Sequence, residues 1–359
     1  MKSSVKLKDI ATNLNLSIGT VQRALHGKGG YSEETRKRIL AEASRLNYTA
    51  NPLASAMRRS EIRIAVVLPE PVNDNKYFFQ YIWKGITKAQ KELEAYNVII
   101  EPIYADTTED ESCTVLRTLL ERETPIHGLI TNASGKDLFK SVMKKFAERS
   151  IPAFMLNAVS RTHESGICTA NANGCVGKLG ADIFLAIHPR AEGKLLILGG
   201  SRESERQSER INDFSRRLTE SCPQLFLQEI HVYTNMANLK TLLEEYLCKF
   251  NDLIGIYAVS ARETLSMCEI VNKLGLSGKI TTIGTDVFPE LLPYFENGTL
   301  TASVYQYPTQ QGYLGVKTVF STITKTENIK TTEIVLPTAA VFKSNAELFC
   351  NETALMNIT

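Results

Sequence analysis

Residues 16–27, Leu-Ser-Ile-Gly-Thr-Val-Gln-Arg-Ala-Leu-His-Gly, have the pattern of a short helix with a marked start and a marked end. The Ser17 hydroxyl can accept a hydrogen bond from a backbone N–H that is otherwise unpaired in the first turn. Gly27 can end the helix, since glycine readily adopts the left-handed backbone that often follows a last turn. Val21, Ala24 and Leu25 recur at three- and four-residue spacing, so they predict one apolar face.

The rest of this predicted helix carries Ile18, Gly19, Gln22, Arg23 and His26. A short helix with hydrogen-bonding groups on its outer side suits the DNA major groove, where the base edges present donors and acceptors. An ordinary amphipathic surface helix has the same pattern, so the neighbouring sequence has to decide between the two interpretations.

Charge is distributed unevenly along the 359 residues. Residues 1–60 contain 11 Lys and Arg against 4 Asp and Glu, a balance of +7. The remaining residues contain 30 against 35, a balance of −5. A small basic segment joined to a mildly acidic body indicates that the basic segment meets a polyanion.

Two more helices are predicted around the first. Residues 6–14 place Ile10, Ala11 and Leu14 on one face, and a tight turn then leads into Ser17. A third helix starts after Ser32 and continues to about residue 46. Three short helices with a sharp turn between the first two make a helix-turn-helix, whose second helix reads DNA.

Beyond residue 61, short apolar segments alternate with amphipathic helical segments, which is typical of parallel sheets covered by helices on both faces. About ten such units are too many for one compact sheet, so we expect two Rossmann-like lobes with ligand at the carboxyl ends of the strands. The predicted strands include residues 62–68, 98–103, 128–131, 153–156, 167–169, 194–198, 228–232, 254–257 and 281–283.

Other classes of protein are disfavoured by what the sequence lacks. No apolar run of the kind a signal peptide or membrane helix needs is present, so we expect a cytoplasmic location. The seven cysteines have no CxxC spacing and the five histidines are isolated, which predicts neither a disulfide framework nor a metal site. No nucleophile elbow or phosphate-binding Gly-Lys-Ser/Thr loop occurs, so we predict no catalytic residue and no cofactor.

Residues 5–59 resemble the DNA-binding head of lac repressor family regulators. The resemblance rests on Lys-Asp-Ile-Ala at 8–11, Leu-Ser-x-x-Thr-Val-x-Arg at 16–23, Ser-Glu-Glu-Thr-Arg-x-Arg-Ile-Leu at 32–40 and Leu-Asn-Tyr at 46–48. It implies that Gln22 pairs with adenine, and Arg23 with guanine or phosphate. The DNA-binding residues that it implies are Ser17, Ile18, Gly19, Thr20, Gln22, Arg23, His26, Asn51, Met57 and Arg58.

Residues 51–61 match the place where the family has a hinge helix that folds on the operator and enters the minor groove. Met57 stands where the family normally has a leucine that wedges between base steps, and methionine is also apolar enough for this. Without the resemblance, the same residues would be a flexible linker. Ile18 and Gly19 also depart from the family, which usually has larger or polar residues there.

Residues 62–340 resemble the core of periplasmic sugar-binding proteins found in lac repressor relatives, which implies their type I fold. The marks are Phe78-Phe79, Asn173-Gly174, Arg210-x-x-x-Phe214, Ile283-Gly284-Thr285-Asp286 and Tyr305-Gln306-x-Pro308. The effector-binding residues so implied are Phe78, Phe79, Asn157, Asn173, Arg210, Ser260, Asp286 and Gln306. Asn157-Ala158 stands where the family often has Asp-Arg, and Ser260 where it often has a longer Asn or Asp. A common aldohexose or ribose is therefore not expected.

The expected domains are a head at 1–50, a hinge or linker at 51–61, a body at 62–345 and a C-terminal tail at 346–359. Within the body, we expect lobe 1 at about 62–157 and 287–322, and lobe 2 at about 158–286 and 323–345. The chain should then cross between the lobes near 157–161, 286–289 and 322–330.

The sequence thus predicts a non-enzymatic, sequence-specific transcription regulator, expected to be a homodimeric repressor on double-stranded operator DNA. A sugar, sugar acid or polyol is the expected effector, and no membrane partner is expected. A solute-binding protein is one alternative, but it would need a signal sequence and no DNA-binding head. An α/β enzyme with a basic appendage is another, and turnover of a sugar phosphate or nucleotide would favour it.

Overall fold

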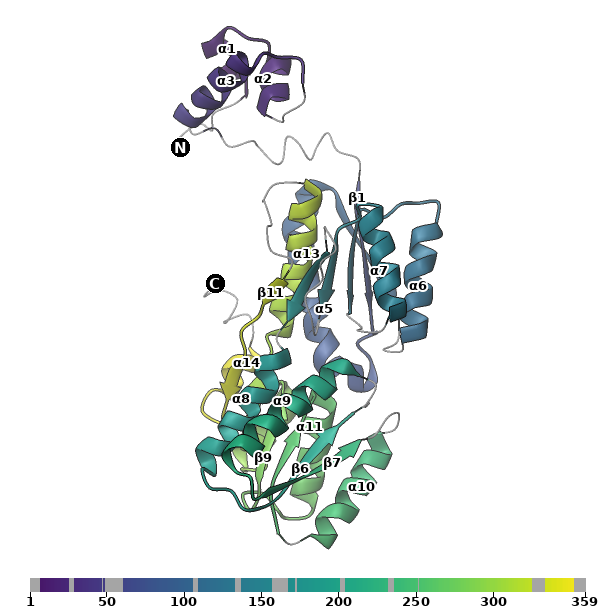
Figure 1. Ribbon diagram of the computed structural model, residues 1–359, viewed down its shortest axis with the longest axis vertical. Coiled ribbons are helices and arrows are strands. Elements are labelled where there is room, and N and C mark those ends of the chain that lie inside the picture. Colours follow the sequence, from purple (N-terminus) through teal and green to yellow (C-terminus); the bar gives the residue numbers. More distant parts are fainter. Residues whose placement is uncertain are drawn as a thin grey trace. The chain divides into compact units, whose positions relative to one another are not determined.

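The computed structural model separates into two compact units, one containing residues 1–61 and the other nearly all of the remaining chain (Figure 1). We call them the head and the body and describe each by itself. The structure describes residues 7–25, 29–46, 48, 61–105, 109–132, 137–156, 167–171, 173–200, 204–231, 236–250, 252–324 and 333–351, with only the backbone at 109–110, 167–171, 173–174 and 236–237.

The head contains the three helices expected from the sequence, α1 (Leu7–Leu14), α2 (Ile18–Leu25) and α3 (Glu33–Arg45). Asn15 makes the sharp turn between α1 and α2 with a positive φ of 54°, a conformation that asparagine tolerates better than most residues. The turn is closed by Leu16 N–H, which donates to the Ala11 carbonyl over 2.9 Å. The buried core of the head consists of Ile10, Ala11, Val21, Ala24, Ile39 and Ala43.

The body contains two six-stranded sheets. The first, sheet A, is parallel and has the order β11 (Glu333–Val335), β5 (Ile167–Asn171), β4 (Ala153–Leu156), β3 (Gly128–Asn132), β1 (Ile62–Leu68), β2 (Val98–Tyr104). The second, sheet B, has the order β12 (Ala339–Val341), β10 (Ala302–Tyr305), β9 (Thr281–Thr285), β8 (Leu253–Ala258), β6 (Gly193–Gly199), β7 (Leu225–His231). Only β12 runs antiparallel to its neighbour in that sheet.

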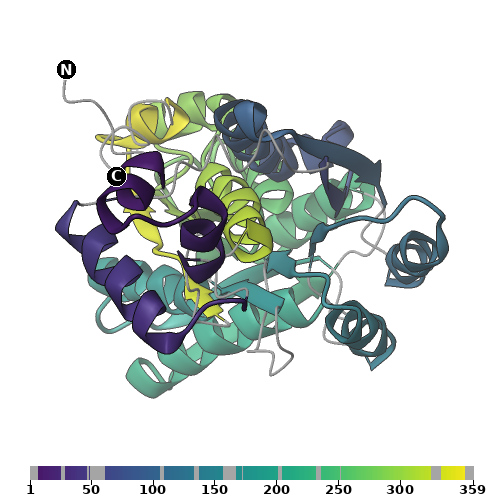
Figure 2. The ribbon, with the colours of Figure 1, turned by 90° about the horizontal axis from the view of Figure 1, so that it is seen from above.

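Helices cover both faces of each sheet. On sheet A, α6 (Glu109–Glu121) and α7 (Asp137–Glu148) lie side by side on one face, and α13 (Pro308–Thr324) with α5 (Lys76–Leu93) lies on the other (Figures 1 and 2). On sheet B the pairs are α8 (Asn173–Ile187) with α9 (Glu205–Ser221), and α10 (Met236–Lys249) with α11 (Ala261–Lys273). Shorter helices are α12 (Leu292–Glu296), α14 (Ala346–Cys350) and the 3-10 turns Asn73–Asn75, Glu94–Tyr96 and Pro289–Leu291.

The strand sequence explains this layering. In β6, Leu195 and Ile197 pack with side chains of α8 and α9, whereas Leu196 and Leu198 pack with those of α10 and α11. Successive side chains of a strand point to opposite faces, so a continuous apolar run requires cover on both sides. None of the described helices is long and apolar enough to cross a bilayer.

The lobe boundaries predicted from the sequence are wrong. Strand β5 pairs with β4, so residues 167–171 extend sheet A rather than lobe 2. Strand β10 pairs with β9, so residues 302–305 belong to sheet B rather than lobe 1. Strand β11 then returns to sheet A beside β5, and β12 to sheet B beside β10.

The chain therefore passes from one sheet to the other between 171 and 173, between 305 and 308, and between 335 and 339. The expected lobe 1 segments, 62–157 and 287–322, become 62–171 and 308–335. The expected lobe 2 segments, 158–286 and 323–345, become 173–305 and 339–351. The physical reason is that a short apolar segment predicts a strand but carries no information about which sheet edge it joins.

Candidate functional site

Helix α2 has one side in the core of the head and one side in solvent, as the sequence predicts. Val21 and Ala24 are buried, whereas Gly19 and Arg23 are exposed and Gln22 is half-buried. Ile18 is 47% exposed. An exposed isoleucine beside an amide and a guanidinium provides both the apolar and the hydrogen-bonding contacts that major-groove readout uses.

Ser17 caps the start of α2. Its Oγ accepts a hydrogen bond from the Thr20 backbone N–H at 3.1 Å and lies 2.9 Å from Thr20 Oγ1. The capping function that the sequence predicts for Ser17 is thus present, and a phosphate contact by Ser17 or Thr20 stays a prediction. Arg23 lies beside the following loop, since a Cβ at Gly30 would be 3.8 Å from Arg23 Cζ.

Several predicted site residues lie outside the described part of the chain. They are His26, Asn51, Met57 and Arg58 of the DNA-binding set and Asn157 of the effector-binding set. Asn173 begins helix α8, but only its backbone is described. Most of the hinge, residues 51–60, also lies outside the described residues.

We expect Ser17→Ala to lower the free energy of unfolding of the head by about 1 kcal/mol, because the Thr20 N–H loses its acceptor. Hydrogen exchange of the amides of residues 7–25 in the full chain measures this loss of protection. Ser44→Ala is the matched control, since Ser44 is exposed near the end of α3 and caps no helix start. Equal exchange in the two variants would contradict the capping function.

Four of the predicted effector-binding residues lie at the carboxyl edge of sheet B, and three of them, Arg210, Asp286 and Gln306, are joined by hydrogen bonds. Ser260, Asp286 and Gln306 follow strands β8, β9 and β10, and Arg210 reaches them from helix α9. Arg210 Nη1 donates to the Val259 carbonyl over 2.9 Å, and its Nη2 donates to Gln306 Oε1. Gln306 Nε2 in turn donates to Asp286 Oδ2 over 2.8 Å. The result is a buried Arg-Gln-Asp chain of hydrogen bonds.

Asp286 is held in an unusual backbone conformation and an unusual electrostatic environment. Its φ is 67°, its N–H donates to the Val304 carbonyl at 2.8 Å, and its carbonyl accepts from Ser303 Oγ at 2.6 Å. Burial raises the pKa of Asp286 to about 7, against the opposing effects of Arg210 and Gln306. Its Oδ1 is buried and has no hydrogen-bond partner among the described residues. This oxygen is a ready acceptor for a ligand hydroxyl.

Close helix packing positions Arg210. A Cβ at Gly177 of α8 would lie 2.3 Å from the Arg210 carbonyl oxygen, so only glycine allows α8 and α9 to approach this closely. Burial lowers the pKa of Arg210, with the nearby Asp286 acting in the opposite direction. The guanidinium is therefore fixed by packing on one side and by the Val259 carbonyl and Gln306 on the other.

Ser260 has a different environment from the one expected for a ligand contact. Its hydroxyl donates to the Glu263 carboxylate in the first turn of α11. Glu263 is buried and also accepts from Arg262 Nε at 2.8 Å. In this structure Ser260 organises the start of α11, and its contact with an effector stays a prediction.

Phe78 and Phe79 lie in the first turn of α5, below the carboxyl edge of sheet A. Their rings meet edge to face, with centroids 5.3 Å apart and planes at 86°; Phe79 is buried and Phe78 half-buried. The neighbouring Tyr77 stacks on Phe288 of the second lobe at 4.6 Å, and Lys76 pairs with Glu290 over 3.6 Å. The first turn of α5 therefore contacts the second lobe.

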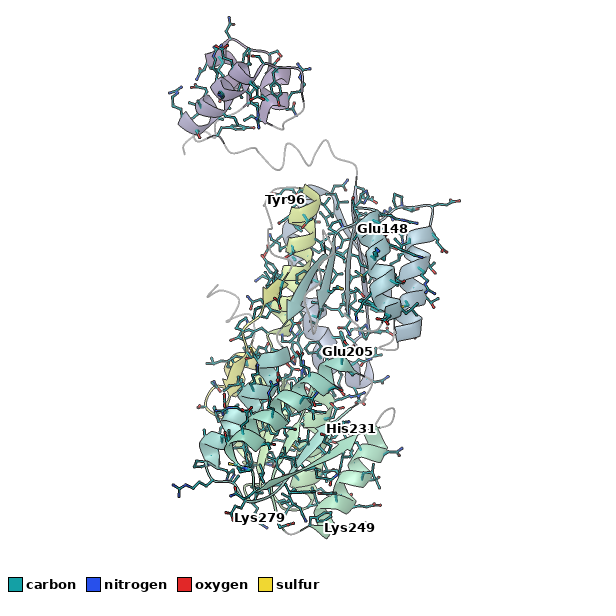
Figure 3. All side chains as sticks on the ribbon, in the orientation of Figure 1. Tyr96, Glu148, Glu205, His231, Lys249 and Lys279 are labelled. Carbon is teal, nitrogen blue, oxygen red and sulfur yellow. The ribbon has the colours of Figure 1, made fainter. Side chains whose placement is uncertain are left out.

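The sequence analysis missed Arg206, the second residue of α9. Its Nη1 donates to Oδ1 of Asn132, the last residue of β3, over 3.4 Å, so this contact joins the carboxyl edges of the two sheets. Figure 3 shows the adjacent Glu205 at the end of the second lobe nearest the first, whereas Lys249 and Lys279 lie at the opposite end. The i, i+4 spacing of Arg206 and Arg210 is the signal that could have identified Arg206 as a site residue, because residues four apart share a helix face.

Comparisons with known proteins agree with this arrangement. Residues 64–327 match the family model described as "Periplasmic binding protein domain", and residues 6–51 match "Bacterial regulatory proteins, lacI family". Among solved structures, the glucose-galactose binding protein GanP of Geobacillus stearothermophilus has a TM-score of 0.68 at 21% identity, over 80% of this chain and 99% of that chain. A solute-binding protein of Burkholderia graminis in complex with D-arabinose has a TM-score of 0.69 at 20% identity, over 80% and 98%.

Two relatives are regulators by name. The chain is 25% identical over 162 residues to catabolite control protein A of Streptococcus mutans, covering 45% of this chain and 46% of that protein. It is 28% identical over 210 residues to the ribose operon repressor of Bacillus subtilis, covering 57% and 58%. The chain thus spans about half the length of the curated relatives it matches. The family model that matches most of the chain shows that it belongs to the periplasmic binding protein domain family, with a segment at residues 6–51 that matches the lacI-family model ahead of that domain.

Proposed function

We propose that this protein is a sequence-specific DNA-binding transcriptional regulator, acting as a repressor in the cytoplasm. The observation that carries the proposal is helix α2, which turns Ile18, Gly19, Gln22 and Arg23 outward from a small buried core in a basic head. The regulator names of the relatives support this, and no enzymatic activity is proposed.

The proposed effector is a small polyhydroxylated molecule bound between the carboxyl edges of the two sheets. The buried Arg210, Gln306 and Asp286 support this, since such a chain has donors and an unpaired acceptor for hydroxyl groups. Solved structures with the same fold include one in complex with D-arabinose. The ligands of those proteins show the class of molecule that the fold can hold.

The proposed mechanism couples effector binding to the arrangement of the two lobes. Tyr77 stacks on Phe288, and Arg206 bonds Asn132, so contacts between the lobes already exist for a ligand to strengthen or replace. A ligand that binds one arrangement better than another shifts their populations, and its effect on DNA affinity cannot exceed that difference in binding free energy.

We also propose that the regulator is a homodimer. Each sheet has an edge strand with an exposed aromatic ring, Tyr104 on β2 at 50% exposure and Phe226 on β7 at 54%. Leu242 of α10 is an exposed apolar side chain as well. Edge strands and exposed apolar residues are liabilities in a monomer, and pairing with a second copy covers them.

We expect Phe226→Asp with Leu242→Asp to convert the dimer into a monomer, because each new carboxylate would have to be buried in the interface. Sedimentation velocity measures the change of mass. Leu348→Asp is the matched control, an equally exposed apolar residue on α14. A double variant that stays dimeric places the interface elsewhere.

Selection of DNA fragments by the full chain, followed by footprinting, tests the proposed function. We expect one preferred site protected against an excess of competitor DNA, with an affinity that falls steeply as salt increases. The footprint is then repeated with added sugars, sugar acids and polyols, one of which should change the protection. Uniform binding to all fragments would show that the protein is not a sequence-specific regulator.

A further inference from the structure

Three guanidinium groups gather near the carboxyl edge of sheet B, and two of them are balanced by carboxylates. Arg210 is linked through Gln306 to Asp286, and Arg262 Nε lies 2.8 Å from Glu263. Arg206 differs, because its hydrogen bond is to a neutral amide oxygen, Oδ1 of Asn132, at 3.4 Å. Within the described ranges of the chain, no carboxylate forms a salt bridge with Arg206.

The environment of Arg206 is unfavourable for a lone cation. The side chain is half-buried, and another cation, Arg210, lies one helical turn away and disfavours the charge of Arg206. Burial, with a smaller effect of Arg210, lowers the pKa of Arg206 to about 10. A partly desolvated charge beside a like charge destabilises the protein unless an anion compensates it. Among the described residues, the positive charge of Arg206 therefore has no carboxylate partner where the two lobes meet.

We propose, on the basis of the proposed function, that the effector is a sugar acid whose carboxylate binds Arg206. A guanidinium matches a carboxylate through two parallel charge-assisted hydrogen bonds, which are stronger than bonds between neutral groups. Arg206 supplies one uncompensated charge, which a monocarboxylate neutralises and a phosphate monoester exceeds. A neutral sugar would leave this charge without a partner.

The spacing within α9 supports the same ligand. Arg206 and Arg210 are separated by about 6 Å along the helix axis, since an α-helix rises about 1.5 Å per residue. A carboxylate at Arg206 therefore places the hydroxyls of the same small molecule near Asp286, whose Oδ1 has no partner among the described residues. The contact of Arg206 with Asn132 puts the carboxylate at the boundary of the lobes, where it can touch both.

The first test needs no ligand and compares Arg206→Gln with Arg217→Gln in the full chain. Arg217 is the matched control on the same helix, because it is exposed and pairs with Asp182 over 2.8 Å. We expect Arg206→Gln to raise the melting temperature of the unliganded protein, or leave it unchanged, since an uncompensated charge is removed. A melting temperature below that of the Arg217→Gln variant would overturn the inference, because Arg206 would then have a structural partner.

The second test measures binding by calorimetry, with D-glucuronate, D-galacturonate and D-gluconate as acid probes. D-glucose, D-galactose and D-glucose 6-phosphate are the neutral and phosphorylated probes. We expect at least one acid to bind about tenfold or more tightly than its neutral parent, with this preference lost in Arg206→Gln and kept in Arg217→Gln. Equal affinity for acid and parent, or tighter binding of the phosphate, would overturn the proposal.

Footprinting with the same samples separates this inference from the proposed function. If a neutral sugar changes operator protection and Arg206→Gln responds like the wild type, the regulator stands and the carboxylate site is refuted. If no operator preference exists, the regulator is refuted. In that case an Arg206-dependent preference for acids would still establish the anion site.

Discussion

Replacing both Gln22 and Arg23 by alanine is expected to abolish the preference for the selected operator over scrambled DNA. Each lost base contact costs about 1–3 kcal/mol, which is roughly fivefold to 150-fold in affinity. A dimer loses both contacts at each half-site. The fold of the head should survive, since Arg23 is exposed and Gln22 only half-buried over the Val21 and Ala24 core. Fluorescence anisotropy with operator and scrambled duplexes at one salt concentration measures the ratio of the two affinities.

The matched control is Lys37→Ala, an exposed basic residue of α3 away from the outer side of α2. Loss of a phosphate contact weakens binding to all sequences alike and reduces the salt dependence by about one ion. We therefore expect Lys37→Ala to leave the ratio of operator to scrambled affinity unchanged. If the Gln22 and Arg23 variant also kept that ratio, α2 would not be the helix that reads the operator.

The head could be predicted from local sequence because its determinants are local. Ser17 caps α2 through Thr20, three residues along the chain, and Val21 and Ala24 recur at helical spacing on the face that fills the core. The same holds for strands β1 to β9 of the body, each of which overlaps a predicted strand, whereas β10, β11 and β12 were not among the predicted strands. Local patterns predict a helix or strand well when its buried side chains recur at the period of that element.

The pairing of strands could not be predicted in this way. Residues 167–169 were predicted as a strand of lobe 2, and residues 302–305 were assigned to lobe 1 without a predicted strand, but β5 pairs in sheet A and β10 in sheet B. Their position depends on which edge is free after the neighbouring strands have paired. The choice of neighbouring strand depends on the whole body, so the apolar pattern of residues 167–171 or 302–305 does not predict it.

The candidate effector site was predictable in part. Arg210, Asp286 and Gln306 do meet, because the carboxyl ends of parallel strands share one edge and α9 packs beside it. Ser260 is joined instead to Glu263, and Arg206 was missed. Asn132, the partner of Arg206, is 74 residues away, so the spacing of a motif does not reveal this contact, whereas Glu263 is only three residues from Ser260.

Asp286→Asn is expected to make the protein more stable above pH 7 while weakening effector binding. Burial raises the folded-state pKa of Asp286 from 3.8 to about 7. Between about pH 4 and pH 7 the folded state keeps the proton that the unfolded state releases, so wild-type stability falls as pH rises through this interval. At about 1.4 kcal/mol per unit, the full effect is on the order of 4 kcal/mol. Urea unfolding of both proteins at pH 5 and pH 8 measures the difference.

Asparagine is the suitable replacement because it tolerates the positive φ of residue 286 and can still accept from Gln306 Nε2. It removes the titrating charge and replaces one acceptor oxygen by an amide donor, so the variant should lose the fall in stability between pH 5 and pH 8. Asp252→Asn is the control, since Asp252 is exposed, pairs with Lys194 over 3.1 Å and should keep that fall. A pH-independent stability difference between the Asp286→Asn variant and the wild type would contradict the buried-carboxylate assignment. The variant should bind the effector less tightly than the wild type, because Asp286 supplies the unpaired acceptor. A variant that is more stable and binds less tightly would show that this carboxylate is kept for binding at a cost in stability.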